Sequence, residues 1–270
     1  MKILLLGHGG FIGSRLYTYL LSNNYKLITM DRQMDILRNN NLFDFIKANL
    51  PHVVINCISF GGKTELHNTD LQLALDNLAL FTNIIRASKY FKKFINIGSG
   101  AEFKEYQGHV KKASENEIWK ACPKFSSYAG SKNIIARLSD GLDNFYTLRL
   151  FGCFGKGEPN FRIFSAYKNA LINKTPLEIS DKYFDNFYVE DFCKIVGHYI
   201  HNNPAVKNIN CVYKEKLKLS QQLELMSFIN KWPRNFIVKE IGKDYTGCSK
   251  NLEDLNLDLV GLSFGMSSYK

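Results

Sequence analysis

The first sixteen residues, MKILLLGHGGFIGSRL, constrain the fold of this 270-residue chain more than any other segment. The short apolar run Lys2–Leu6 has the composition of a buried strand. Four glycines follow between positions 7 and 13, and an amphipathic pattern then extends to Ser22. A strand, a glycine-rich turn and a helix in this order are typical of a repeating βα unit in a parallel sheet.

The spacing of the glycines is typical of a dinucleotide-binding turn. Gly7, Gly10 and Gly13 form the pattern Gly-x-x-Gly-x-x-Gly. In such a turn the first glycine permits the tight bend, the second lets backbone approach a pyrophosphate, and the third lets the helix pack closely on the strand. The first helical residues, Phe11 and Ile12, then present free N–H groups to the phosphates.

The residues that would select the cofactor come about twenty positions later. Asp31 follows the expected strand Lys26–Met30, where a carboxylate accepts hydrogen bonds from the adenosine ribose and favours NAD. A turn or helix cap is the alternative for Asp31. Arg32 would pair with a 2′-phosphate and favours NADP. The sequence therefore predicts NADP(H) or NAD(H) without choosing between them.

Alternating apolar runs and helical patterns extend the βα arrangement through the first 155 residues. The expected strands are HVVINCIS, KFINIGS and FYTLRLF, and the expected helices cover residues 42–49, 70–90 and 128–140. Shorter elements follow: strands at 186–189 and 208–213, and helices at 191–201 and 220–231, the last capped by Ser220. We predict an α/β fold, a Rossmann-type doubly wound parallel sheet (residues 1–155) with a small mixed C-terminal substrate lobe (residues 156–270). The two parts are expected to interleave near residues 186–201.

The segment YAGSK predicts a group for proton transfer. Tyr128 and Lys132 lie four residues apart, on one face of the expected helix. A free phenol has a pKa of about 10, and a nearby cation lowers it, which makes a tyrosine usable as a general acid or base. Ser99 ends the strand KFINIGS, at the sheet edge where such folds bind ligands. Each residue alone has a structural alternative, a packing pair or a turn serine, but the ordered set predicts a redox site.

These segments together resemble the extended short-chain dehydrogenase/reductase family, in its nucleotide-sugar epimerase, dehydratase and reductase branch. The matching segments are GHGGFIG, TMDR, PHVVINCIS, DNLALFTNIIRAS, FINIGSGAEF, YAGSK, LRLFGCFG and, more loosely, FDNFYVEDF. The resemblance implies that Tyr128 donates and accepts the proton, that Lys132 binds the nicotinamide ribose, and that Ser99 holds the reacting oxygen. The further cofactor-lining positions that it implies are Cys57, Ile58, Ser59 and Asn77.

Departures from the family's motifs narrow the reaction. Dehydratases of the family carry Asp-Glu directly after the serine, where this chain has Gly100 and Ala101, with Glu102 later. Enzymes similar to GDP-fucose synthase have a cysteine where Ala101 stands and use a later histidine, and this chain has none between His109 and His198. The resemblance then implies reduction of the C4 keto group of a nucleotide-linked 4-keto-6-deoxy sugar by NAD(P)H.

Two other functions stay open at this point. A 4-epimerase would hold NAD tightly and return the hydride to the opposite face of the sugar, although the short C-terminal part resembles a reductase lobe more closely. A regulatory protein that binds NAD(P) without turnover belongs to another class. Relatives of that kind usually lose the tyrosine–lysine pair, which this chain keeps.

Two basic residues are candidates for contact with the nucleoside diphosphate of the sugar. The family often has an asparagine after LRLF, where Gly152 stands in this chain, and FDNFYVED lacks the arginine often found beside it. Arg162 and Lys174 would take over the contact, because a guanidinium can grip a phosphate through two hydrogen bonds. A solvated surface charge is the alternative for both.

Composition limits the other partners. The net charge is +10, but the lysines are dispersed, which predicts no nucleic-acid binding. No apolar run approaches the roughly eighteen residues of a membrane span, and the first run is too short for a secretion signal. The six cysteines form no CxxC pair, which predicts reduced, buried thiols and no metal site in a cytoplasmic protein. The resemblance also implies a homodimer that pairs helices 70–90 and 128–140.

Overall fold

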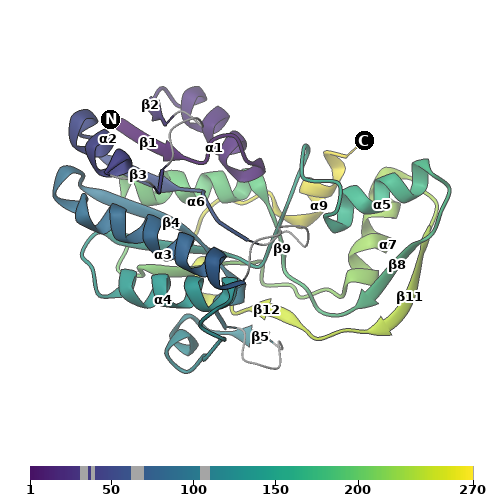
Figure 1. Cartoon of the computed structure of the whole chain (residues 1–270). Coiled ribbons are helices and arrows are strands. Elements are labelled where there is room, and N and C mark those ends of the chain that lie inside the picture. Colours follow the sequence, from purple (N-terminus) through teal and green to yellow (C-terminus); the bar gives the residue numbers. More distant parts are fainter. Residues whose placement is uncertain (31–35, 38–39, 62–69, 104–109, 270) are drawn as a thin grey trace.

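The computed structural model describes residues 1–30, 36–37, 40–61, 70–103 and 110–269, and a parallel sheet lies at its centre (Figure 1). The strands of this sheet are β1 (Lys2–Leu6), β2 (Lys26–Thr29), β3 (Val53–Asn56), β4 (Lys93–Ser99), β6 (Phe145–Leu150) and β10 (Asn208–Cys211). Their spatial order is β10-β6-β4-β3-β1-β2, and all neighbours are parallel. The predicted doubly wound α/β fold is therefore confirmed.

The winding of the sheet changes direction next to β1. Leu4 of β1 lies opposite Ile28 of β2 on one side and Val54 of β3 on the other. The chain thus moves first to one side of β1 and then to the other. In open α/β sheets ligands bind at such a switch point, outside the carboxyl ends of the strands.

Helices cover both faces of the sheet (Figure 1). They are α1 (Phe11–Ser22) and α6 (Val189–His201) on one face, and α2 (Asn41–Asn49), α3 (Asp70–Arg86) and α4 (Tyr128–Asp140) on the other. Successive side chains of β1 alternate between these layers, because a strand points its residues to opposite faces. Ile3 and Leu5 pack in the core that contains Leu16 of α1, and Leu4 packs in the core that contains Ile46 of α2.

A smaller group of elements lies to one side of the sheet (Figure 1, right). It contains α5 (Ile163–Ile172), β8 (Leu177–Asp181), α7 (Leu219–Asn230), β11 (Phe236–Ile241) and α9 (Gly261–Ser267). Strands β8 and β11 pair in parallel. Between these segments the chain returns to the main sheet, where α6 packs on α1 and β10 extends the edge beside β6. The two parts of the fold are thus interleaved in sequence.

Several short elements complete the described part of the chain. They are β7 (Gly152–Phe154) paired with β9 (Asn186–Tyr188), β5 (Val110–Ala113) paired with β12 (Tyr245–Gly247), α8 (Lys250–Glu253), and the 3-10 helices η1 (Ser88–Tyr90), η2 (Gly100–Phe103) and η3 (Glu115–Trp119). Both strand pairs bring together segments distant in the sequence. Strand β12 therefore reaches the region that follows the carboxyl end of β4.

Four predicted elements have the expected bounds, and the others differ by one or more residues at their ends. The strands at 2–6 and 93–99 and the helices at 11–22 and 128–140 agree with the sequence analysis. The expected helix 70–90 ends at Arg86 and continues as η1. Ser220 does not cap α7, because that helix begins at Leu219 and the backbone N–H of Ser220 donates to Asp181 Oδ1 at 3.0 Å. A carboxylate from β8 thus stabilises the helix start instead.

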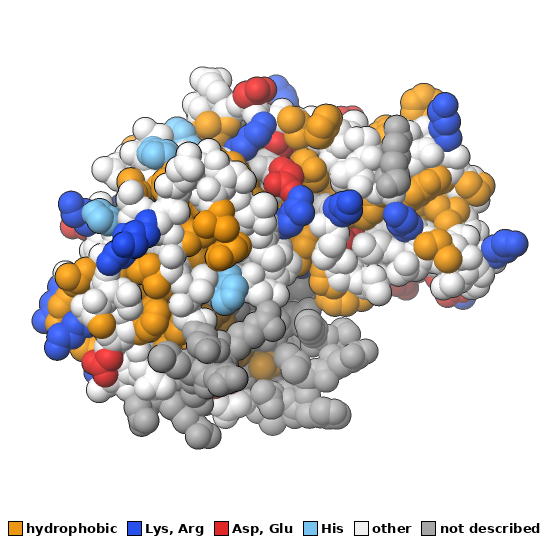
Figure 2. Space-filling view, turned by 90° about the horizontal axis from the view of Figure 1, so that it is seen from above, with side chains coloured by type: hydrophobic (Ala, Val, Ile, Leu, Met, Phe, Trp, Pro, Cys, Tyr) orange, Lys and Arg blue, Asp and Glu red, His pale blue; other side chains and the backbone are white. Residues whose placement is uncertain are grey.

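The exposure of the cysteines and the distribution of basic side chains can be compared with the expectations from composition. All six cysteines are free thiols, but Cys122 is exposed, so the expectation that all are buried is wrong. Lys and Arg side chains on the face in Figure 2 lie apart, with polar and apolar atoms between them. Every helix in the described part of the chain is too short or too polar to cross a bilayer.

Gly13 lies where α1 meets β1 and leaves no room for a side chain. A Cβ at this position would lie 2.1 Å from the backbone oxygen of Gly7, so Gly13→Ala forces the helix away from the strand. Overpacking costs about 1–3 kcal/mol, and we expect a loss of about 2 kcal/mol or more in the free energy of unfolding, measured by urea denaturation. Gly141→Ala is the matched control, because its Cβ would meet nothing closer than 3.7 Å. Equal stability of the two variants would contradict this packing account.

Candidate active site

The glycine turn leaves the start of α1 open to an anion. Gly7 has a φ of +81°, which side-chain-bearing residues rarely adopt, and Gly13 allows α1 to begin directly against it. Gly10 is the N-cap of α1 and has no side chain to accept from the first N–H groups, and the first turn contains no acid. The positive end of the helix therefore faces the carboxyl edge of the sheet with no acid in its own first turn to neutralise it.

A pocket of about 290 Å³ opens from this turn along the carboxyl ends of the strands. It is lined by Gly10, Phe11, Ile12, Gly13, Cys57, Ser59, Gly61, Ile97, Gly98, Ser99, Tyr128, Lys132, Leu150, Phe151, Cys153, Pro159, Phe161 and Arg162. The three predicted catalytic residues and most of the predicted cofactor-binding positions thus share one cavity. The smaller group of elements contributes Pro159, Phe161 and Arg162, from the segment that precedes α5.

The start of α4 positions Tyr128 in this pocket. Ser127 caps the helix by accepting a hydrogen bond from Gly130 N at 3.0 Å. Gly130 has no space for a side chain, because a Cβ would lie 2.3 Å from Lys124 O. The first turn of α4 is therefore held tightly against the segment before it. Tyr128 is the first residue of this helix and lines the cavity.

Lys132 brings a buried positive charge next to Tyr128. Its side chain is 2% exposed, and its Nζ lies 5.8 Å from the centroid of the Tyr128 ring. The ammonium donates a long hydrogen bond, 3.3 Å, to Ile97 O. Burial raises the pKa of the neighbouring Cys57 thiol to about 12 although the charge of Lys132 opposes this shift. The thiol of Cys57 thus stays protonated. The hydrogen bond to Ile97 O uses one N–H of the Lys132 ammonium, which leaves other donors for a ligand.

Ser99 is held in place by hydrogen bonds to two residues of η2, Ala101 and Glu102. Its N–H donates to Glu102 Oε1 at 2.8 Å, and its Oγ accepts from Ala101 N at 3.2 Å. The 3-10 helix η2 thus folds back on the end of β4 and holds the serine at the edge of the pocket. A hydroxyl fixed in this way can hydrogen-bond an oxygen of a ligand in the cavity.

Glu102 is committed to a buried ion pair. Both Glu102 and Arg149 are fully buried, and Arg149 Nε donates to Glu102 Oε2. Gly98 lies opposite Arg149 in the neighbouring strand and leaves the space through which the two side chains meet. With Oε1 bound to Ser99 N and Oε2 bound to Arg149, Glu102 has a structural role rather than that of a free base.

The two glycines that depart from the family's motifs are explained by packing. A Cβ at Gly100 would lie 2.4 Å from the ring of Phe151. A Cβ at Gly152 would lie 2.4 Å from Asn186 Oδ1 and 2.6 Å from the Phe184 ring. An acid at position 100 or an asparagine at position 152 would therefore require these side chains to move.

Two predicted residues, Asn77 of α3 and Ile58 of the loop after β3, lie outside the cavity lining. Asn77 is buried and clamps this loop: its Nδ2 donates to Phe60 O and Leu73 O, both at 2.8 Å, and its Oδ1 accepts from Phe60 N. Ile58 packs against the glycine turn, and its N–H donates to Asn56 Oδ1 at 3.1 Å. Both residues therefore shape the loop that carries Cys57 and Ser59.

The two candidate diphosphate contacts lie in different places. Arg162 lines the pocket, donates from Nη1 to Cys153 O at 3.0 Å, and places its guanidinium carbon 5.9 Å from the Phe11 ring centroid. Its Nε is buried and has no hydrogen-bond partner among the described residues. Lys174 is exposed after the end of α5, and the lining of the pocket does not include it. The cofactor-selecting candidates Asp31 and Arg32 lie outside the described residues.

The sequence analysis missed two contributors to the site. Tyr245, from β12, packs its ring 5.1 Å from that of Phe151 in the pocket lining, and no local motif indicates that contact. The Glu102–Arg149 pair had a weak signal, because a charged residue inside the apolar run FYTLRLF requires a buried partner.

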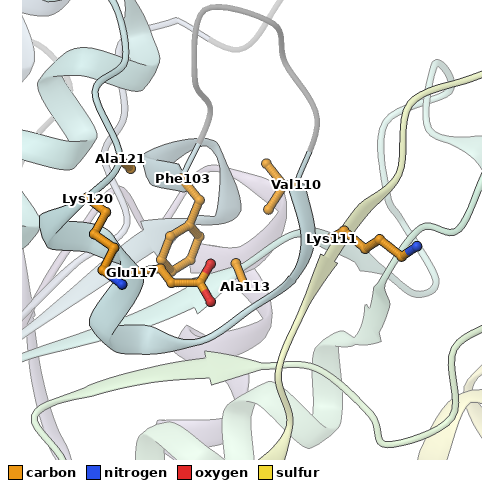
Figure 3. A pocket seen from close by; sticks show the side chains of 7 residues that line it. All are labelled: Phe103, Val110, Lys111, Ala113, Glu117, Lys120 and Ala121. Atoms are coloured by element: carbon orange, nitrogen blue, oxygen red, sulfur yellow. The ribbon is translucent and has the colours of Figure 1, made fainter.

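A second pocket, of about 240 Å³, lies beside η2, η3 and β5 (Figure 3). Phe103 forms one wall, and its ring stacks 6.1 Å from that of Phe151, which lines the first pocket. In Figure 3 Lys111 points away from the ring of Phe103. Ser99, Tyr128 and Lys132 are absent from its described lining and line the first pocket instead.

The first pocket fits a dinucleotide. It combines an uncapped helix N-terminus behind a glycine turn with a phenol, an ammonium and a hydroxyl further along the same edge. The sequence model of the NAD dependent epimerase/dehydratase family matches residues 3–211. The chain therefore belongs to that family, which confirms the resemblance found in the sequence.

The sequence identities to individual relatives are low. GDP-L-colitose synthase of Yersinia pseudotuberculosis is 26% identical over 107 residues, which is 38% of this chain and only 35% of that protein. A GDP-mannoheptose C4 reductase from Campylobacter jejuni with NADP bound superposes with a TM-score of 0.83 at 17% identity, covering 99% of this chain and 96% of that one. A UDP-glucuronic acid 4-epimerase from Bacillus cereus with UDP-glucuronic acid and NAD gives a TM-score of 0.77 at 19% identity, covering 99% and 97%. At these identities the two solved structures share the fold.

The buried ion pair generates a stability prediction. Arg149→Met removes the counter-charge of a fully buried carboxylate, and breaking such a pair costs about 3–5 kcal/mol. Urea denaturation of the variant should show a loss of this size. The double variant Glu102→Gln/Arg149→Met should be less destabilised than Arg149→Met, because it buries no unpaired charge. A double variant less stable than the single variant would contradict the ion-pair account.

Proposed function

We propose that the chain is a nucleotide-sugar 4-ketoreductase that uses NADPH or NADH. Its substrate would be a nucleotide-linked 4-keto-6-deoxy sugar. The observation that carries this proposal is that Ser99, Tyr128 and Lys132 line the same cavity as the glycine turn. When bound, the nicotinamide supplies a hydride for C4 of the sugar.

The residues of the chain would divide the remaining work. Tyr128 gives its proton to the oxygen on C4 as the keto group becomes a hydroxyl. Lys132 binds the nicotinamide ribose and stabilises the phenolate that the proton leaves behind. Ser99 holds the same sugar oxygen, which orients C4. Arg162, with its unpartnered Nε at the pocket, contacts the nucleoside diphosphate.

Two other reactions of the family lack their acid or base in this site. Dehydration needs a free acid–base pair after the serine, but Gly100 is packed against Phe151 and Glu102 is bound to Arg149. Enzymes similar to GDP-fucose synthase epimerise C3 and C5 with a cysteine, where this chain has Ala101, and with a later histidine, which this chain lacks between His109 and His198. The chemistry left for the pocket is hydride transfer at one carbon, with Tyr128 transferring the proton to the oxygen on that carbon.

The names of the relatives favour a GDP-linked sugar. The Yersinia relative is a GDP-L-colitose synthase and the Campylobacter structure is a GDP-mannoheptose C4 reductase. We therefore propose GDP-linked 4-keto sugars as the first compounds to test, with other nucleotides as comparison.

A 4-epimerase is the second candidate. The likeness to the UDP-glucuronic acid 4-epimerase, with a TM-score of 0.77, supports it. Such an enzyme would interconvert two sugars without net consumption of NAD(P)H, so the two functions differ in a directly measurable product.

A homodimer through α3 and α4 also belongs to the proposal. These helices pack against each other, and Leu71, Leu75 and Leu138 on them are between 44% and 50% exposed. Apolar side chains gathered on adjoining helices are typical of a surface that a second subunit covers.

The test is a panel of nucleotide-linked 4-keto-6-deoxy sugars incubated with NADPH or NADH, followed at the nicotinamide absorbance band. Loss of absorbance with one sugar is the expected result. Conversion of a 4-hydroxy sugar to its epimer without loss of absorbance, together with nicotinamide that co-purifies, would favour the epimerase.

Tyr128→Phe is expected to lower kcat by about 10²- to 10⁴-fold, because the variant cannot donate a proton, while cofactor affinity stays within a few-fold. The measurements are steady-state kinetics and calorimetric titration with NADP(H) or NAD(H). Tyr90→Phe is the control, since Tyr90 lies in η1, next to the amino end of β4 and away from the pocket. Full activity of Tyr128→Phe would refute the proposed role, and a cofactor-binding protein with no turnover in any variant would point to regulation.

A further inference from the structure

Tyr269, which follows α9, binds the loop 155–162 that connects β7 to α5. The Tyr269 hydroxyl accepts a hydrogen bond from Gly155 N at 3.0 Å and donates one to Gly155 O at 3.2 Å. The side chain is buried, and its ring centroid lies 6.2 Å from that of Phe164 in α5. One hydroxyl thus pairs with both backbone groups of the first residue of this loop.

Helix α9 lies between α6 and α5 (Figure 1), and hydrogen bonds tie this segment to both helices. At the start of α9, Gly261 N donates to Oδ2 of the fully buried Asp191 in α6 at 2.9 Å. After the end of α9, Lys168 Nζ of α5 donates to the backbone oxygen of Tyr269 at 2.9 Å. The position of the Tyr269 hydroxyl is therefore fixed from both parts of the fold.

Two turns and a helix cap connect Gly155 to the start of α5. Glu158 N donates to Gly155 O at 3.1 Å, and Arg162 N donates to Pro159 O at 2.9 Å. Glu158 Oε1 accepts from Ser165 N, in the first turn of α5, at 2.9 Å. Arg162 is the N-cap of the same helix. The position of Gly155 is thus transmitted to Arg162 through hydrogen bonds within one short segment.

This loop ends at the pocket, where Pro159, Phe161 and Arg162 belong to the lining. Nη1 of Arg162 is held by Cys153 O at 3.0 Å, but its buried Nε has no hydrogen-bond partner among the described residues. A buried donor is costly when it stays unpaired, so the arrangement favours a ligand that accepts from it. A phosphate oxygen is a strong acceptor for a guanidinium.

We propose that Tyr269 is a positioning residue for substrate binding: its hydroxyl fixes the loop 155–162 so that Arg162 meets the diphosphate of the nucleotide sugar. This inference rests on the proposed function for its ligand. Tyr269 is absent from the described lining of the pocket, so it acts through Arg162 and not by touching the ligand. Its contribution to binding therefore disappears when the guanidinium is removed.

The test is calorimetric titration of GDP, and of UDP in parallel, into protein saturated with NADP or NAD. Tyr269→Phe keeps the ring but leaves Gly155 N buried without this acceptor, so we expect about fivefold weaker binding of the tighter of the two diphosphates. Arg162→Met should weaken it about tenfold or more. In the Arg162→Met background, Tyr269→Phe should change the affinity less than about twofold.

Three results of these titrations would overturn the proposal. The first is unchanged diphosphate affinity in Tyr269→Phe, or losses that multiply in the double variant. The second is weaker binding of NADP or NAD to Tyr269→Phe with diphosphate affinity unchanged, because the loop would then serve the cofactor. The third is wild-type protein that binds neither GDP nor UDP.

Tyr167→Phe is the matched control. Tyr167 is fully buried in α5, and its hydroxyl donates to Pro233 O at 3.1 Å, outside the described lining of the pocket. Its loss should lower the urea midpoint as much as Tyr269→Phe does or more, while diphosphate affinity stays at the wild-type value. Affinity that falls with the midpoint in both variants would make the role of Tyr269 merely structural.

Amide hydrogen exchange tests the contact without ligand or turnover. In a peptide that covers residues 154–162, exchange of the slowest amides should be about tenfold faster in Tyr269→Phe and unchanged in Tyr167→Phe. Unaltered exchange in Tyr269→Phe would refute the contact with Gly155. Inactivity of the wild type on every 4-keto sugar, with binding and exchange as expected, would refute only the reductase function.

Discussion

The close approach of α1 to β1 determines where this protein can bind a ligand. Gly13 has no side chain, so the helix starts against the backbone of Gly7, and Gly7 adopts the positive φ that the turn requires. The uncapped N-terminus of α1 then lies at the point where the sheet changes its direction of winding. The strand ends that carry Ser99 and Phe151, and the helix that carries Tyr128, surround the same edge. A bulkier residue at Gly13 would push α1 away from β1 and so move the first residues of α1, which line the pocket.

The buried pair of Glu102 and Arg149 shows why residue type alone does not define a catalytic group. Glu102 is an acid within three residues of the predicted catalytic serine, which is where a proton acceptor would be sought. Both of its oxygens are occupied, one by the backbone of Ser99 and one by Arg149, at a site without solvent. Its contribution is to hold the end of β4 in place. The division between a residue that reacts and a residue that supports thus follows from hydrogen-bond partners, which only the structure supplies.

The sequence predicted the parts of the fold that depend on local patterns. Strand β1, helix α1, strand β4 and helix α4 begin and end as expected, because apolar periodicity and glycine spacing act over a few residues. The pairing of β5 with β12 joins positions more than a hundred residues apart, and no short pattern specifies it. The packing of Tyr245 against Phe151 depends on that pairing and was therefore not predictable. The prediction that Ser220 caps α7 was wrong for a similar reason, because the carboxylate that binds the start of this helix, Asp181, comes from another element.

The central claim is that the cavity beside the glycine turn carries out hydride transfer to C4 of a nucleotide-linked sugar. Its most direct test uses NADPH or NADH with deuterium on the transferred position of nicotinamide C4 and a GDP-linked 4-keto-6-deoxy sugar. Mass spectrometry and NMR of the sugar product report where the label goes. The account predicts one deuterium per molecule, on C4 of the sugar, with one cofactor oxidised for each. A sugar product without deuterium, or one formed while the cofactor stays reduced, would contradict it.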